Sequence, residues 1–156
     1  MDGGFSWLLI GLLAAALAVA AVGDWRSRII PNWLNGAIAL LAIPYWWASG
    51  LSVWPDVPVQ IAVAAGLFLV FALAFRLGAM GGGDVKMIAA IALWLPPAAV
   101  LQLLVIMSIA GGVLTIAMLI PHRLARSGGN PEIPYGVAIA FAGIWLIGQQ
   151  FLNHFG

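Results

Sequence analysis

The 156-residue sequence contains no cysteine, which excludes disulfides, thiolate zinc sites, iron–sulfur clusters and a cysteine nucleophile. Charged residues are almost as scarce, at 7% of the chain against about 25% in an average soluble domain. The formal net charge of +1 gives no electrostatic footprint for a nucleic acid. Because 64% of the residues are hydrophobic, the composition predicts an integral protein of the lipid bilayer.

Long apolar segments occupy most of the chain. They predict an all-α, polytopic membrane protein, with 1–156 forming a single domain and no internal repeat. The expected bundle has six transmembrane helices, at about 5–23, 30–47, 57–75, 85–95, 98–120 and 134–151. No Lys or Arg precedes the first segment, so it is expected to be a true span rather than a cleaved signal peptide.

The fourth apolar segment is short. Its roughly eleven residues, at 1.5 Å of rise each, cover about half of a 30 Å hydrocarbon core. Irregular backbone at such a depth is tolerated only where it is buried in protein or lines a wet cavity. The glycine-rich loop expected at 77–84 is therefore predicted to face a water-filled cleft between helices.

Basic residues predict the orientation of the chain. All six fall at the ends of the first, third and fifth segments or at the starts of the second, fourth and sixth: Arg26, Arg28, Arg76, Lys86, Arg123 and Arg126. Those positions share one side, which the positive-inside rule makes cytoplasmic. The opposite side carries Asp2 and Asp56 and no Lys or Arg, so both termini are predicted to lie outside the cytoplasm.

Two acidic residues, Asp24 and Asp84, stand at the edges of apolar segments on the basic side. A carboxylate so close to hydrocarbon is costly and indicates function. Two of them at one depth favour aspartic protease chemistry, in which one takes a proton from water and the other polarises the peptide carbonyl. Glycines 81–83 would let another backbone approach Asp84 and would permit unusual backbone angles.

Spacing alone leaves other interpretations open. Asp24 could pair with Arg26 or Arg28, and Asp84 with Lys86, as interfacial ion pairs. Asp84 could also be a solvated residue in a flexible turn. The histidines His122 and His154 are single, with no partner at ligand spacing, so no metal and no cofactor is predicted.

Three motifs resemble signatures of the type IV prepilin peptidases. The segment 24–32 has an Asp followed by a basic residue and then Ile-Pro-Asn. The segment 81–86 resembles the GxGD motif, with a Lys two residues after the Asp; presenilins and preflagellin peptidases share this motif. The tripeptide 134–136, Pro-Tyr-Gly, is similar to a third family feature. All three occur in order on a chain with six apolar segments, so the resemblance covers essentially its whole length.

The resemblance implies an aspartic endopeptidase that removes prepilin leaders, with Asp24 and Asp84 as the catalytic pair. It implies a bacterial inner-membrane protein, with periplasmic termini and a cytoplasmic active site. The implied partners are a prepilin whose leader ends in glycine, the lipid bilayer and the pilus assembly machinery. Residues implied to shape or support the site are Gly81, Gly82, Gly83, Lys86, Arg26, Pro31, Asn32, Pro134, Tyr135 and Gly136.

The chain departs from the large prepilin peptidases, which carry a cytoplasmic region with paired CxxC motifs associated with N-methylation of the pilin. Its first span begins almost at Met1, and it resembles the short, peptidase-only form of tight-adherence (Flp) pilus systems. Two alternatives from other classes are a small transporter or proton-coupled channel, and a non-catalytic subunit of a pilus or secretion assembly. A transporter would favour acids near the bilayer midplane and internal repeats. An assembly subunit would leave both aspartates dispensable.

Overall fold

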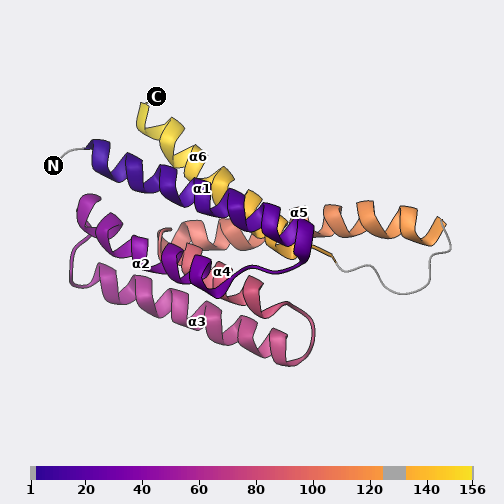
Figure 1. Ribbon diagram of the computed structural model, residues 1–156. Coiled ribbons are helices and arrows are strands. Elements are labelled where there is room, and N and C mark those ends of the chain that lie inside the picture. Colours follow the sequence, from indigo (N-terminus) through magenta and orange to yellow (C-terminus); the bar gives the residue numbers. More distant parts are fainter. Residues whose placement is uncertain (1–2, 125–132, 156) are drawn as a thin grey trace.

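A computed structural model describes residues 3–124 and 133–155 of the chain, and their regular secondary structure is entirely helical. The helices are α1 (Gly3–Ser27), α2 (Asn32–Ala48), α3 (Asp56–Arg76), α4 (Gly82–Ala92), α5 (Pro97–Leu124) and α6 (Tyr135–Phe155), arranged as Figure 1 shows. Three are long and apolar enough to cross a membrane, over Gly4–Ser27, Asp56–Arg76 and Pro97–Ile120. The prediction of an all-α polytopic membrane protein is confirmed.

The shortest helix, α4, forms the centre of the bundle. It packs against α2, α3 and α6, while α1 packs against α2 and α6 and α5 packs mainly against α6. In Figure 1 the second half of α5 extends beyond the other helices. Seven of the eleven residues of α4 are buried: Asp84, Val85, Met87, Ile88, Ala90, Ile91 and Ala92. The helix that carries Asp84 is therefore enclosed by its neighbours.

Helix α4 is only about 16 Å long, and Ala92, Trp94 and Leu95 at its end are buried in the protein. Carbonyl groups at such an end need donors, since no water is present in hydrocarbon. Neighbouring helices supply them. The Gln60 amide donates to the carbonyls of Ala92, at 3.0 Å, and Leu95, and the Trp46 indole donates to that of Leu93 at 2.7 Å.

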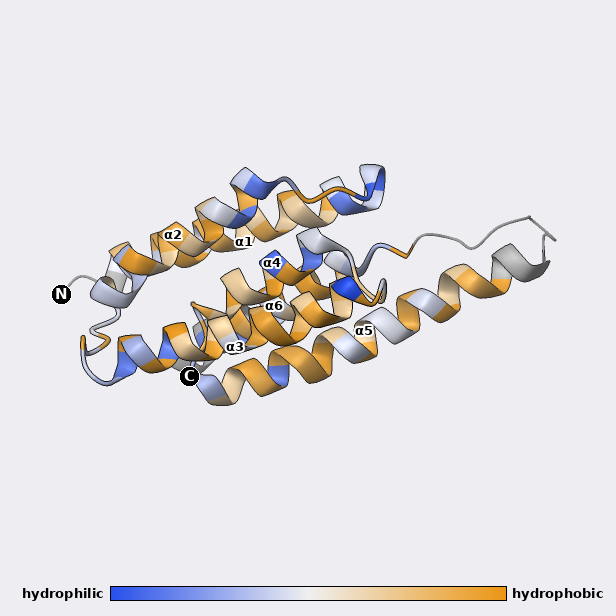
Figure 2. Cartoon of the chain, turned by 90° about the horizontal axis from the view of Figure 1, so that it is seen from below, coloured by the Kyte–Doolittle hydropathy of each residue, from blue (hydrophilic) through white to orange (hydrophobic). Residues whose placement is uncertain are grey.

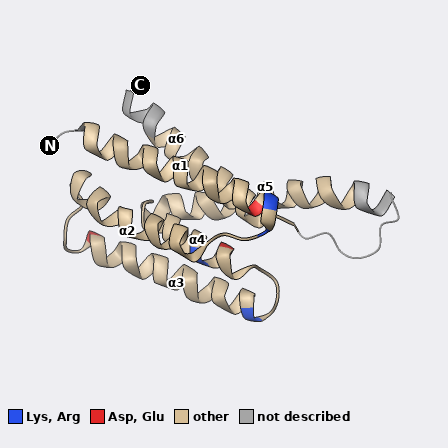
Figure 3. Ribbon diagram, in the orientation of Figure 1, with Lys and Arg blue, Asp and Glu red and all other residues tan. Residues whose placement is uncertain are grey.

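Most of the charged residues coloured in Figure 3 lie toward one end of the bundle. Arg26 lies in the last turn of α1 and Arg76 in the last turn of α3, whereas Asp56 lies in the first turn of α3, at the opposite end. Hydrophobic residues cover most of the length of the helices (Figure 2). Since α1 begins and α6 ends at the end away from the arginines, the arrangement matches an even number of crossings.

The glycine-rich loop is shorter than the predicted 77–84, because Gly82, Gly83 and Asp84 form the first turn of α4. Gly81 precedes the helix in an extended conformation, with φ −72° and ψ 144°. Among the described glycines, positive φ occurs only at positions 50 and 78, so the unusual backbone angles expected at 81–83 are not found. An aspartate in the first turn is favoured by the helix dipole, which offsets the low helix propensity of glycine.

Two other boundaries also extend helices beyond their predicted ends. Helix α1 continues past the expected end at Gly23, so Asp24 is helical. Helix α5 continues to Leu124, which shortens the polar loop predicted at 121–133. The predicted loop residues Arg126 and Glu132 lie outside the described residues.

Candidate active site

The two predicted catalytic residues line the same small cavity. Asp24 comes from the last turn of α1 and Asp84 from the first turn of α4. The cavity has a volume of about 170 Å³ and is lined by Asp24, Arg28, Ile29, Ile30, Gly81, Gly82, Gly83 and Asp84. A water molecule occupies about 30 Å³ in the liquid, so this space can hold the water that a hydrolysis needs.

Both carboxyl groups are nearly enclosed, with Asp24 only 5% and Asp84 only 8% exposed. The charge of Asp24 acts directly on Asp84 across the cavity. Burial and mutual repulsion disfavour the ionisation of both carboxyl groups, so at intermediate pH the pair can hold a single proton between them. The arrangement can therefore present one proton acceptor and one proton donor to the same bound molecule.

Of the local pairs that spacing alone left open, only Arg28 with Asp24 shows an electrostatic interaction among the described residues. Lys86, two residues after Asp84, donates a hydrogen bond to Oδ1 of Asn32 at 2.7 Å. Arg26 is exposed on α1. Arg28 is the base whose charge acts on Asp24.

The start of α6 approaches Asp24 closely. The backbone N–H groups of Gly136 and Val137 face the Asp24 carboxyl group, so the positive end of the helix dipole meets a negative charge. A Cβ at Gly136 would lie 2.8 Å from Oδ2 of Asp24 and 2.6 Å from Cδ1 of Ile30. Only glycine allows the α6 backbone to come this near. Oδ2 itself is buried without a hydrogen-bond partner among the described residues.

The three glycines before Asp84 also allow neighbouring atoms to lie close to the backbone. A Cβ at Gly81 would stand 2.9 Å from Oδ2 of Asp84, and one at Gly83 would stand 3.1 Å from Cβ of Ile30. A Cβ at Gly82 would lie 3.3 Å from the Phe75 ring. The GGGD sequence therefore packs the first turn of α4 tightly against the α1–α2 connection, the Phe75 ring and its own aspartate.

Arg28 shapes the wall of the cavity, although the sequence resemblance pointed to Arg26. With φ 57° it adopts the left-handed conformation that ends α1. Its N–H donates to the Asp24 carbonyl at 3.0 Å, and its guanidinium donates to the same oxygen at 3.4 Å. Position 28 is four residues after Asp24, about one helical turn, whereas Arg26 points to another face. That spacing is the signal that could have identified Arg28.

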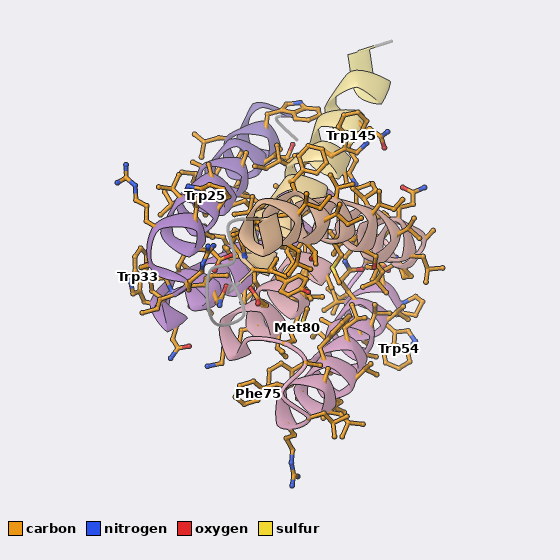
Figure 4. The ribbon with its side chains drawn as sticks, turned by 90° about the vertical axis from the view of Figure 1, so that its right-hand side faces the viewer. Trp25, Trp33, Trp54, Phe75, Met80 and Trp145 are labelled. Carbon is orange, nitrogen blue, oxygen red and sulfur yellow. The ribbon has the colours of Figure 1, made fainter. Side chains whose placement is uncertain are left out.

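The remaining predicted support residues surround the cavity without lining it. Pro31 precedes α2 with φ −64°, and Asn32 begins that helix. Pro134 is fully buried and Tyr135 is half-buried, its ring lying against Gly111. Figure 4 looks onto the charged end, where Trp25 and Trp33 lie on the outer side of α1 and α2. They are 56% and 69% exposed, as expected for aromatic anchors at a membrane interface.

A further residue, Asn35, was not predicted. Its amide Nδ2 donates to the Gly83 carbonyl at 3.1 Å, which joins α2 to the first turn of α4. Its signal in the sequence is a polar residue inside an apolar segment, three positions after Asn32 and hence on a neighbouring part of the same helix face.

Taken together, the helical bundle and the cavity define a membrane protein that encloses a pair of carboxylates near its charged end. The sequence model of the type IV leader peptidase family matches residues 11–116, a range that includes both Asp24 and Asp84. The chain belongs to the type IV leader peptidase family, which confirms the predicted resemblance and makes the protein a peptidase. No curated protein and no solved structure matches the chain significantly.

Proposed function

We propose that the chain is an aspartic endopeptidase that removes the leader peptide of a prepilin-like substrate, with Asp24 and Asp84 as its catalytic pair. The observation that carries the proposal is that both carboxyl groups are buried and line one small cavity. Their position in the end turns of α1 and α4, rather than halfway along the helices, argues against proton carriers of a transporter.

The chemistry follows from one proton shared by two carboxylates. The ionised carboxylate accepts a proton from the bound water, whose oxygen attacks the peptide carbonyl, while the protonated one donates its proton to the carbonyl oxygen. As the tetrahedral intermediate collapses and its C–N bond breaks, one carboxyl donates its proton to the leaving nitrogen, and the other carboxylate takes a proton from a hydroxyl of the intermediate. The products are a free leader acid and a new N-terminal amine, and the pair regains its single proton.

The substrate must offer an extended peptide bond to a site at the end of a helical bundle. In this proposal its apolar helix packs laterally against the protein in the bilayer, and the segment around the cleavage site unwinds. Glycines 81–83 supply a cavity wall without side chains, along which an extended strand can form backbone hydrogen bonds. A leader that ends in glycine adds no bulk at the scissile bond.

Prepilin cleavage is the direct test of the proposed function. Co-expression with candidate prepilins from the same source is expected to release the leader, seen as a loss of mass in the pilin, and to leave its new N-terminus unmethylated. Cleavage is expected to persist in EDTA, because two carboxylates and a water suffice for the reaction. Loss of cleavage in EDTA that zinc restores would contradict the aspartic mechanism, and uncleaved prepilins would contradict the substrate class.

The orientation is a separate proposal, in which the charged end faces the cytoplasm of a bacterial inner membrane. Single-cysteine variants test it without background, because the chain contains no cysteine. Leu77 at the charged end and Val53 at the other end are 76% and 84% exposed. A membrane-impermeant thiol reagent added to intact spheroplasts is expected to label Val53→Cys and not Leu77→Cys. The reverse pattern would invert the topology and place the site outside the cytoplasm.

A further inference from the structure

Buried amide side chains hold α4 at both of its ends. Gln60 of α3 is 6% exposed and donates to the carbonyls of Ala92 and Leu95, where the helix stops. Asn35 of α2 is 4% exposed and donates to the Gly83 carbonyl, in the first turn. The two contacts differ in one respect. Gln60 bonds the Leu95 carbonyl beyond the end of the helix, whereas Asn35 bonds a carbonyl that already lies within the helix.

The Gly83 carbonyl does not need Asn35 for its hydrogen bonding. It lies inside α4, where the N–H four residues further on provides the helical bond. Asn35 in turn leaves its own Oδ1 buried without a hydrogen-bond partner among the described residues. Burying a half-satisfied amide opposes folding. Stability therefore does not explain the presence of Asn35, in contrast to Gln60.

The Asn35 contact instead fixes a distance across the cavity. Gly83 immediately precedes Asp84, and a Cβ at Gly83 would lie 3.1 Å from Cβ of Ile30, which belongs to the α1–α2 connection. That connection leads back to Asp24 through Arg28, whose N–H bonds the Asp24 carbonyl. Asn35, in the first turn of α2, thus ties the wall that follows Asp24 to the turn that carries Asp84.

We infer that Asn35 is a positioning residue, which sets the separation between Asp24 and Asp84 at some cost in stability. The inference rests on the proposed function, since it assumes that the two carboxylates act as a pair. Displacing one reacting group by about 1 Å can cost a hundredfold in rate. Asn35 touches neither substrate nor the reacting atoms, so its effect passes through the first turn of α4.

The variant Asn35→Leu tests this, because leucine is similar in size and suits an apolar site. With a purified prepilin as the probe, kcat is expected to fall at least tenfold with KM little changed, while the Tm stays the same or rises. The pH profile of cleavage is expected to narrow, because carboxylates further apart repel less and their two apparent pKa values approach each other. The other charged groups nearby remain in place, namely Arg28, which lines the cavity, and Lys86, which bonds Asn32.

Gln60→Leu is the matched control, since it removes the other buried amide that bonds α4. It is expected to lower the Tm by leaving the Leu95 carbonyl without its buried donor, and to keep the wild-type kcat and pH profile below that temperature. If Asn35→Leu loses Tm and activity together with an unchanged pH profile, as a structural residue would, the inference fails. Wild-type kcat in Asn35→Leu would also overturn it.

The smaller variant Asn35→Ala repeats the measurement without an added apolar group, and failure of both variants to fold would contradict a positioning role. The assay includes the wild type together with Asp24→Asn and Asp84→Asn. If the wild type cleaves, the aspartate variants do not, and Asn35→Leu is unimpaired, only the inference that Asn35 is a positioning residue is contradicted. If the aspartate variants cleave normally, the proposed catalytic pair is lost instead.

Discussion

Asp24→Asn and Asp84→Asn are each expected to reduce prepilin cleavage by about a thousandfold or more while leaving membrane insertion intact. Asparagine preserves the shape of the side chain and part of its hydrogen bonding, but it cannot exchange a proton. Both carboxyl groups are nearly fully buried beside the same cavity, so no neighbouring acid among its lining residues can replace either one. The measurement is cleavage by purified, correctly inserted single and double variants.

The losses should not add, because two groups that share one proton work as a unit. Wild-type cleavage should fall at low pH, where both carboxyls are protonated and neither can accept a proton from water. It should also fall at high pH, where both are ionised and neither can donate a proton to the carbonyl oxygen. A structural role for the aspartates predicts mild folding defects with retained cleavage. Substantial activity in either single variant would contradict the two-aspartate mechanism.

Gly136→Ala is expected to lower cleavage on the order of a hundredfold, although it adds only a single methyl group. The added Cβ would lie 2.6 Å from Cδ1 of Ile30 and 2.8 Å from Oδ2 of Asp24, so the side chains or the start of α6 must move. Alanine is a better helix former than glycine by up to about 1 kcal/mol, so helix propensity does not oppose the change. The loss should therefore appear in kcat, through displacement of Asp24.

Gly148→Ala is the matched control, because it lies in the same helix and a Cβ there meets nothing within 4 Å. It should cleave at the wild-type rate and show an equal or slightly higher Tm. Comparison of the two alanine variants removes any general effect of helix propensity in α6. Wild-type cleavage by Gly136→Ala would show that the close contact between α6 and Asp24 is dispensable.

The sequence allowed the fold class and the two carboxylates to be predicted, because both depend on local properties. Apolar segment length predicts a helical membrane protein, and an aspartate at the edge of such a segment is costly enough to indicate function. The beginning of α4 was not predicted, since glycines argue for a loop unless tertiary contacts outweigh their low helix propensity. At Gly83 and Gly136 those contacts come from Ile30 and Asp24, far away in the sequence.

Arg28 was predicted only as a possible ion-pair partner of Asp24, and Asn35 was not predicted, for a related reason. Arg28 lines the cavity because its left-handed backbone ends α1 and turns the chain. The sequence does not indicate which basic residue of this segment adopts that conformation. Asn35 matters because it reaches a carbonyl 48 residues away. Single-sequence patterns report which helix face is apolar, whereas the partner of a buried polar group depends on how the helices pack.

The enclosure of α4 has a consequence for the way the bilayer acts on this protein. A spanning helix responds to a thicker or thinner membrane by changing its tilt. Helix α1 packs against α2 and α6 but can meet the lipid directly, since much of its surface is exposed, including Leu8, Leu12, Val19 and Val22. Helix α4 is too short to span and is surrounded by α2, α3 and α6. A change in bilayer thickness can therefore shift Asp24 directly, through the tilt of α1. It can shift Asp84 only indirectly, through the helices that surround α4.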